Sequence, residues 1–258
     1  MKRNFTLLAC FLCMLFTAAK AAETEPNDTR AQANVLALNG SNFGKISPAG
    51  DHDWWKITTT GDGQLSITLS PLSGRYTYAF LYDNDGVTQL ASSYSNGVFS
   101  ISADGLAAGT YYVQVFCYYN TDTTGYTISN TLTQPAQAND AEPNNTKAAA
   151  LTLPLNGSKT GHIGYLFNNK RDTTDWYKIT TNADGLLTVS LNPVNGQYVY
   201  ATLYDNDGKT ALASQYSNSA FSISADGLAA GTYYVQLYCY YSYGFAPYTL
   251  SNSLTKVK

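Results

Sequence analysis

FSISADGLAAGTYYVQ is the sequence of residues 99–114 and, letter for letter, of residues 221–236. In both places an aromatic segment with one cysteine follows, VFCYY and LYCYY. An internal repeat of this length indicates a duplicated domain. Two units of this size are each large enough to bury a core of their own. We therefore predict two domains, residues 22–133 and 140–258, joined by a linker over residues 134–139.

Around the repeat, apolar and polar residues alternate with a period of two. Glycine, asparagine and aspartate separate these runs, and no segment has a helical period. The pattern predicts an all-β fold of two tandem antiparallel β-sandwiches of the jelly-roll kind. The second copy repeats the order of the first and has one clear insertion, residues 164–169. In the first copy the expected strands cover residues 54–60, 65–69, 76–82, 89–93, 98–103, 110–119 and 126–132.

The N-terminal segment, residues 1–21, has a basic start, an apolar run from Leu7 to Phe16 and a small-residue end. These features are typical of a secretory signal peptide cleaved before Ala22. A lipoprotein signal ending at Cys10 is the less favoured alternative. The apolar run is too short for an ordinary membrane-spanning helix. We expect a secreted protein, extracellular or at the cell surface, with no membrane span.

The net charge of the chain limits the classes of partner that it can bind. Without residues 1–21 the chain keeps 12 basic and 18 acidic residues, a net charge of −6. Nucleic-acid binding needs a basic face, so this balance argues against it. An acidic balance agrees with the binding of cations.

The sequence offers no recognisable catalytic machinery. His52 and His162 are the only histidines, and neither has metal-ligand spacing or a nucleophile motif beside it. The sequence contains no Gly-x-Ser-x-Gly motif and no phosphate-binding loop. Cys117 and Cys239 lie in phase with apolar residues, which predicts buried small side chains rather than a disulfide or a nucleophile. We expect a protein that is not an enzyme.

Four motifs occur in the same order in both copies. Glu-Pro-Asn-(Asp/Asn)-Thr opens each copy at residues 25–29 and 142–146, and a strand beginning at Asp53 or Asp175 follows. Leu-Tyr-Asp-Asn-Asp-Gly and Leu-Ala-Ala-Gly-Thr-Tyr-Tyr-Val complete the series. This order resembles the bacterial pre-peptidase C-terminal (PPC) domain, whose relatives include the collagen-binding domains of clostridial collagenases. The resemblance covers residues 22–258 almost entirely, twice.

Carboxylates and amides gather in two short segments of each copy. Such hard oxygen donors suit Ca²⁺, which takes six to eight oxygen ligands in irregular geometry, whereas crowded acids without a cation repel one another. The alternative is that these residues only form a turn and begin a strand. The candidate ligands are Glu23, Glu25, Asn27, Asp28, Asp51 and Asp53 in the first copy, and Asp140, Glu142, Asn144, Asn145, Asp172 and Asp175 in the second.

The resemblance implies a similar calcium site. In the collagen-binding relatives the ion lies between an acid-x-acid-x-Asn arm and an Asp-x-x-Asp pair, and Asp172 and Asp175 have that spacing. Asp51 and Asp53 are one residue closer together. A serine ligand of those relatives corresponds to Lys45 and His162 here. The Asp-Asn-Asp-Gly segments at residues 83–86 and 205–208 are better explained as hairpin turns.

Aromatic residues alternate with aliphatic ones on two strands of each copy, which predicts an outward aromatic face. Exposed tyrosines bind sugars, peptides or neighbouring subunits at modest entropic cost. By the resemblance, Phe116, Tyr118, Tyr238 and Tyr240 correspond to binding tyrosines of the collagen-binding domains. Packing under loops is the competing interpretation for any one of them. The candidate ligand-binding residues are Tyr112, Phe116, Tyr118, Tyr234, Tyr238 and Tyr240.

Three hypotheses for the function follow. The first is a noncatalytic, calcium-binding protein that binds an extracellular polymer, a collagen-like protein or a polysaccharide, through its tyrosine faces. The second is a self-assembling subunit of an extracellular filament or matrix, since open sheet edges and head-to-tail contacts lead to fibres. The third is an accessory or inhibitor of a separate secreted peptidase.

Overall fold

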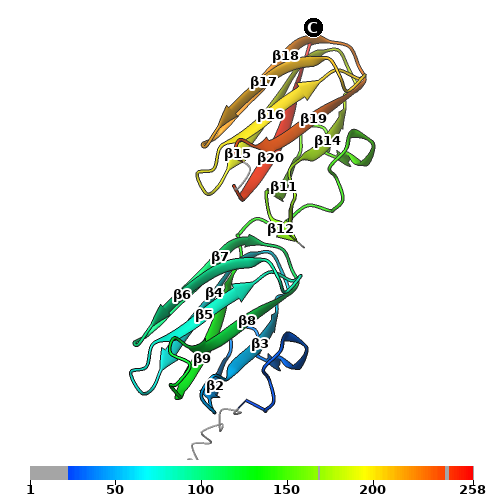
Figure 1. Cartoon of the computed structure of the whole chain (residues 1–258). Coiled ribbons are helices and arrows are strands. Elements are labelled where there is room, and N and C mark those ends of the chain that lie inside the picture. The colour runs from blue at the N-terminus through cyan, green and yellow to red at the C-terminus, as the bar shows by residue number, and fades with distance from the viewer. Residues whose placement is uncertain (1–22, 168, 242–243, 258) are drawn as a thin grey trace, which may run out of the picture.

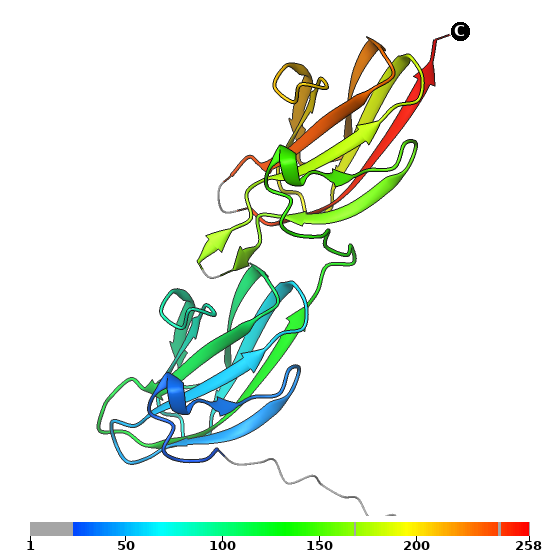
Figure 2. The same ribbon diagram turned by 90° about the vertical axis from the view of Figure 1, so that its right-hand side faces the viewer.

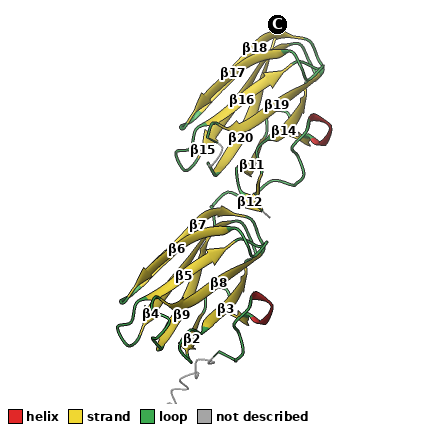
Figure 3. Ribbon diagram, in the orientation of Figure 1, coloured by secondary structure: helices red, strands yellow, loops and turns green. Residues whose placement is uncertain are grey.

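The computed structural model describes residues 23–167, 169–241 and 244–257, so the expected signal peptide lies outside the described residues. The described chain forms two β-sandwiches, one after the other (Figure 1). The all-β prediction is confirmed. Two single-turn 3-10 helices, η1 (Arg30–Gln32) and η2 (Lys147–Ala149), occupy equivalent places in the two sandwiches (Figure 3). Within the described ranges, no helix has the length and apolarity needed to cross a membrane.

The first sandwich consists of two facing sheets. One sheet has the spatial order β1 (Asn34–Val35), β3 (His52–Thr58), β8 (Thr110–Cys117), β5 (Thr77–Tyr82) and β6 (Gln89–Ser95). The other contains, in spatial order, β7 (Phe99–Leu106), β4 (Gly63–Pro71), β9 (Thr124–Thr133) and β2 (Ser41–Ile46). Except for the short parallel pair β1–β3, these pairings are antiparallel.

The second sandwich repeats this topology in the same orientation, as both views show (Figures 1 and 2). Its first sheet has the order β10 (Leu151–Thr152), β14 (Asp175–Thr180), β19 (Thr232–Cys239), β16 (Val199–Tyr204) and β17 (Ala211–Ser217). Its second sheet has the order β11 (Ser158–Ile163), β20 (Ala246–Lys256), β15 (Gly185–Pro193) and β18 (Phe221–Leu228).

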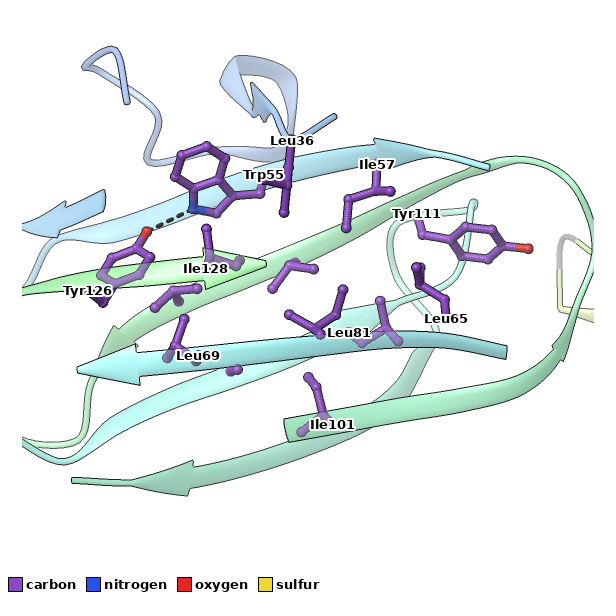
Figure 4. Close-up of a cluster of buried hydrophobic side chains, with 14 of the residues drawn as sticks. Leu36, Trp55, Ile57, Leu65, Leu69, Leu81, Ile101, Tyr111, Tyr126 and Ile128 are labelled. Carbon is purple, nitrogen blue, oxygen red and sulfur yellow. Dashed lines mark hydrogen bonds between the residues drawn. The ribbon is translucent and has the colours of Figure 1, made fainter. Parts of the chain in front are cut away.

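Each sandwich has its own hydrophobic core, and strict alternation of buried and half-buried residues along the strands produces it. In the first sandwich Trp55, Ile57, Leu81 and Tyr111 point between the sheets (Figure 4). The duplicated stretch is central to this arrangement, because residues 99–114 cover β7 in one sheet, the connection to the other sheet and most of β8. The same sixteen residues therefore link the two layers of each sandwich.

The cysteines are free thiols on the core side of equivalent strands. Cys117 is buried, which confirms the prediction of a buried small side chain, whereas Cys239 is only half-buried. Burial raises the pKa of the Cys117 thiol to about 11 and that of the Cys239 thiol to about 12.

The insertion in the second copy forms a small hairpin, β12 (Leu166–Phe167) and β13 (Lys170–Arg171), which lies between the two sandwiches (Figure 2). Leu166 pairs in parallel with Leu106, at the end of β7 of the first sandwich. Its side chain belongs to the hydrophobic core of the first sandwich. The sequence located this insertion but did not indicate that it bridges the two domains.

Candidate cation sites and aromatic surfaces

The acidic arm of the second sandwich lies against the first residue of β14. A backbone hydrogen bond from Trp176 N to Asn144 O (3.0 Å) joins the arm to the strand. Carboxylate oxygens of Asp140, Glu142 and Asp175 then lie within 4.8 Å of one another. Asn144 and Asp175 are completely buried. The structure therefore brings together residues that are 35 positions apart in the sequence, from Asp140 to Asp175.

Several buried oxygens in and around this cluster have no hydrogen-bond partner among the described residues. They are Oδ1 of Asp140, Oδ1 of Asn144, Oδ2 of Asp172 and Oδ1 of Asp175. A buried carboxylate or amide oxygen without a partner costs about 1–3 kcal/mol. A cation among these oxygens would remove that cost, and the donor set is of the kind that Ca²⁺ prefers. The residues present thus fit a hard cation.

Two buried tyrosines hold Oδ2 of Asp140 and Oδ2 of Asp175. The Tyr248 hydroxyl lies 2.6 Å from Asp175 Oδ2 and 3.2 Å from Asp140 Oδ2. The Tyr177 hydroxyl donates to the same oxygen of Asp140. These contacts fix one oxygen of Asp140 and one of Asp175, and leave Oδ1 of each without a partner. Sequence reasoning missed both tyrosines, although Tyr177 lies two positions after Asp175 and so on the same face of β14.

The pKa values of these acids are raised, mainly by burial. Burial raises the pKa of Asp172 to about 7, with repulsion from Asp140 adding to the shift. Burial and the charge of Asp172 raise the pKa of Glu142 to about 7. Asp175 has a pKa well above its ordinary value because it is buried next to Asp140 and Asp172. Crowded carboxylates of this kind bind protons readily when no metal ion compensates their charge.

The first sandwich has the corresponding cluster. Oxygens of Glu23, Glu25 and Asp53 lie within 4.8 Å of one another. Tyr126 donates to Asp53 Oδ2 (2.7 Å), and Trp55 Nε1 donates to the Tyr126 hydroxyl (2.8 Å; Figure 4). Trp55 thus takes the place of Tyr177. Burial raises the pKa of Glu23 to about 7 and that of Asp53 to about 8.

The other candidate ligands lie at different depths around the clusters. Asn27 is buried and its amide nitrogen lies 3.4 Å from Glu23 Oε2. Asp51 accepts a hydrogen bond from Ser47 N (2.7 Å). Asp28 and Asn145 are exposed at the rim. Among the described residues, each group of acids whose ligand atoms lie within 4.8 Å of one another contains three residues. The sequence had suggested six ligands in each copy.

The two histidines have structural surroundings. His52 stacks on Phe116, with 4.7 Å between ring centroids, and its Nδ1 lies 3.0 Å from Gln114 Nε2. His162 is buried between the sandwiches, where its ring nitrogens lie 3.4 Å from Asp62 Oδ2 and 2.5 Å from the Gln137 carbonyl. The resemblance matched His162 to a serine ligand, but in the structure its side chain contacts the neighbouring sandwich and the linker.

The outward face of β5, β6 and β8 carries a continuous group of aromatic rings. The inward residues of β5, Ala79 and Leu81, are buried, so the predicted orientation of this strand is correct. The second sandwich has the same arrangement on β16, β17 and β19. We call the first group the N-terminal aromatic surface (Tyr76, Tyr78, Phe80, Tyr94, Phe116, Tyr118 and Tyr119) and the second the C-terminal aromatic surface (Tyr198, Tyr200, Tyr216, Tyr238, Tyr240 and Tyr241).

Within each surface the rings stack on one another. Tyr78 and Tyr118 are 5.3 Å apart with 16° between ring planes. Their equivalents, Tyr200 and Tyr240, are 5.5 Å apart at 14°. Stacked neighbours cover each other's faces, so ring edges and hydroxyl groups remain accessible. Tyr118 is 42% exposed and Tyr240 is 46% exposed.

Two of the six candidate binding residues lie apart from these surfaces. The Tyr112 ring is covered by the Arg30 guanidinium, 5.7 Å from the ring centroid. The Tyr234 ring is covered by the Lys147 ammonium at 5.1 Å. Each pair anchors the 3-10 helix that follows the acidic arm. We assign Tyr112 and Tyr234 to this anchoring cation–π contact.

Comparison with known proteins gives only distant likenesses. No protein-family model matches the chain, and no curated protein matches it. Among solved structures, one sandwich is similar to the pre-peptidase C-terminal domain of a collagenase from Bacillus anthracis, with 21% identity and a TM-score of 0.33 over 44% of this chain and 99% of that one. The periplasmic inhibitor PliG of g-type lysozyme from Aeromonas hydrophila has 16% identity and a TM-score of 0.31 over 41% and 97%. At these values neither likeness assigns a family or a function.

Proposed function

We propose that this chain is a noncatalytic extracellular protein that binds a fibrous protein through its two aromatic surfaces and is stabilised by Ca²⁺ in its two acidic clusters. The observation that carries the proposal is the duplicated aromatic surface. The two sandwiches have the same orientation (Figure 1), so both surfaces face the same side of the molecule. Large exposed aromatic groups on one side of a soluble protein indicate an interaction site.

The ring arrangement favours a protein ligand over a polysaccharide. A sugar ring stacks on the face of an aromatic side chain, and here neighbouring rings already cover many of those faces, as between Tyr200 and Tyr238 (4.6 Å, 12°). Ring edges and phenol hydroxyls can instead contact apolar side chains and donate hydrogen bonds to backbone carbonyls. Tyrosine supplies such contacts at low entropic cost because its ring is rigid.

Two equivalent surfaces suit a ligand with repeated binding positions. When one surface is bound, the other is held at a high effective concentration near the next position on the same fibre. Linked sites of this kind bind about 10²–10⁴ times more tightly than either site alone, provided that both can bind at once. Weak binding by each surface would therefore be sufficient.

Calcium has a structural role in this proposal. The acidic clusters lie where each arm meets β3 or β14, and the aromatic surfaces lie on the outward face of the same sheets. The four buried oxygens without partners in and around the second cluster support a bound cation. Bound Ca²⁺ would fix the arm onto the sheet and neutralise Asp140, Glu142 and Asp175.

Cosedimentation with polymers tests the binding proposal. Residues 23–258 are incubated with fibrillar collagen, with chitin and with cellulose in calcium, and we expect binding to the collagen fibres. The double variant Tyr118→Ser/Tyr240→Ser should lose at least about tenfold in affinity, because it removes one exposed ring from each linked surface. Val87→Ser, at a 75% exposed turn position away from both surfaces, is the matched control.

Three outcomes would contradict the proposal in different ways. Binding to chitin or cellulose alone would identify a polysaccharide ligand. Unchanged collagen binding by the double variant would place the binding site elsewhere. Sedimentation of the protein alone as large particles, lost in the double variant, would assign the aromatic surfaces to contacts between copies.

A further inference from the structure

The contact between the two sandwiches uses the end of the duplicated stretch. Leu106 is 1% exposed and Ala107 is 6% exposed, because the β12–β13 hairpin covers them. Ala107 N donates to the Leu166 carbonyl at 2.9 Å, which extends the strand pairing. Phe245 packs so closely on Gly105 that a Cβ there would lie 2.6 Å from the Cβ of the phenylalanine.

Two carboxylates of the first sandwich complete this contact. Asp83, in the β5–β6 turn, is completely buried and accepts a hydrogen bond from Asn169 N (2.7 Å) through Oδ2. Asp62, in the β3–β4 turn, accepts from Asn139 Nδ2 (2.9 Å) and lies 3.4 Å from His162 Nδ1. Their other oxygens, Oδ1, accept from backbone N–H groups of the first sandwich, Asn84 N and Ala108 N.

The second sandwich has the same constellation at its own far end, near the C-terminus (Figure 1). Gly227, Leu228 and Ala229 have the same sequence as residues 105–107. Asp205 and Asp184 accept from Asn206 N (2.7 Å) and Ala230 N (2.8 Å) through Oδ1, as Asp83 and Asp62 do from their own neighbours. These two aspartates of the second sandwich therefore make the same backbone hydrogen bonds as their counterparts at the covered end of the first sandwich.

The two ends differ in what covers them. Gly105, Leu106 and Ala107 are buried, whereas Gly227 and Ala229 are exposed and Leu228 is half-buried. A Cβ added at Gly227 would meet nothing within 4 Å. The sequence is identical, so the difference in burial comes only from the presence of the neighbouring domain at one end.

We propose that this end of the second sandwich, formed by Gly227, Leu228, Ala229, Asp184 and Asp205, is a docking site for a β-hairpin carried by a further sandwich domain. The ligand is defined by the occupied copy of the same surface. The ligand must carry an apolar residue whose backbone carbonyl accepts a hydrogen bond from Ala229 N. It must also supply a backbone N–H that donates to Asp205, and an imidazole or amide group that donates to Asp184. The inference does not depend on the proposed function.

A second copy of this chain does not supply that ligand. The hairpin of each copy already lies on its own first sandwich, where covalent linkage gives it a high effective concentration. The exposed end of the first sandwich cannot substitute for it. Residues 47–50 (Ser-Pro-Ala-Gly) replace the hairpin there, and Lys45 stands in the position of His162.

The test extends the full chain at its C-terminus with another copy of residues 134–258. Segmental isotope labelling of the original chain makes its amides visible to NMR apart from those of the appended copy. In the unextended chain the Ala107 amide should be protected from hydrogen exchange and the Ala229 amide should exchange rapidly. In the extended chain we expect at least about tenfold slower exchange at Ala229, as in a closed, hydrogen-bonded edge.

A control extension carries Ser-Pro-Ala-Gly in place of residues 164–171 of the appended copy and should leave exchange at Ala229 fast. Circular dichroism verifies that the appended copy folds in both extensions. Fast exchange at Ala229 in the hairpin extension, with Ala107 still protected, would overturn the proposal. Protection of Ala229 that rises with concentration in the unextended chain would identify a second copy as the ligand and would also overturn it.

Discussion

The hydroxyl of Tyr248 lies 2.6 Å from Oδ2 of Asp175, and both groups are buried beneath the acidic arm. Tyr248→Phe would leave this carboxylate oxygen without its donor. We expect the unfolding free energy in chelator to fall by about 1–3 kcal/mol, the usual cost of a buried polar group that loses its partner. Urea unfolding of the variant and the original chain measures this change in unfolding free energy. Tyr241→Phe, at a 56% exposed ring, should change stability little, and an equal loss there would show that the Asp175 contact is not responsible.

Calcium should stabilise the protein against unfolding through residues of the clusters. At a free concentration of about 100 times the dissociation constant, one site adds about 2.7 kcal/mol. Asp175→Asn should abolish the contribution of the second site while leaving stability in chelator unchanged or higher, because it removes a buried charge. Asp226→Asn, at an exposed position near the end of β18, is the control. An undiminished calcium response in Asp175→Asn would exclude this residue as a ligand.

Stability in chelator should fall as the pH rises from about 4 to 8. The folded pKa values of Glu23, Glu142 and Asp172 are raised to about 7 and that of Asp53 to about 8, mainly by burial. The folded state therefore holds more protons than the unfolded state across this range, and deprotonation favours unfolding. Calcium should reverse the trend, because it binds the ionised carboxylates. Urea unfolding at pH 5, 6.5 and 8, with and without calcium, measures both slopes.

A matched pair of glycines isolates the contact between the sandwiches. Gly105 and Gly227 have φ values of 64° and 67°, so alanine at either position costs roughly 1–2 kcal/mol in the left-handed region. Only at Gly105 would the added Cβ also clash with Phe245. Gly105→Ala should therefore destabilise more than Gly227→Ala and should increase the radius of gyration in small-angle X-ray scattering. Equal effects of the two variants would contradict the close packing at this contact.

Much of the fold could be predicted because the signals are local. Alternation along Leu65, Ile67 and Leu69 fixes which side of β4 faces the core, and the turn at residues 83–86 links β5 and β6 as expected. Strand β2 was missed because it has only two buried residues, Gly44 and Ile46. An edge strand of this kind lacks the full alternation on which the prediction depends.

The candidate site could be predicted only in part. The acidic arms are visible as short runs of oxygen donors, but the contact from Tyr126 to Asp53 joins residues 73 positions apart. Residues that meet across a sandwich are far apart in the sequence, so no local sequence pattern predicts their contact. The sequence did not indicate the role of Leu166 for the same reason, because its partner Leu106 lies in the other domain. In addition, strand β12, which contains Leu166, has only two residues.

Because of the hairpin formed by β12 and β13, the order of the two domains along the chain also matters. Only the second sandwich carries it, and only the far end of the preceding sandwich receives it. A permuted chain with residues 140–258 placed before residues 23–133 would keep both sandwiches but leave the hairpin uncovered and the junction between the domains unformed. The two halves, although built from the same sixteen-residue repeat, are therefore not interchangeable in order.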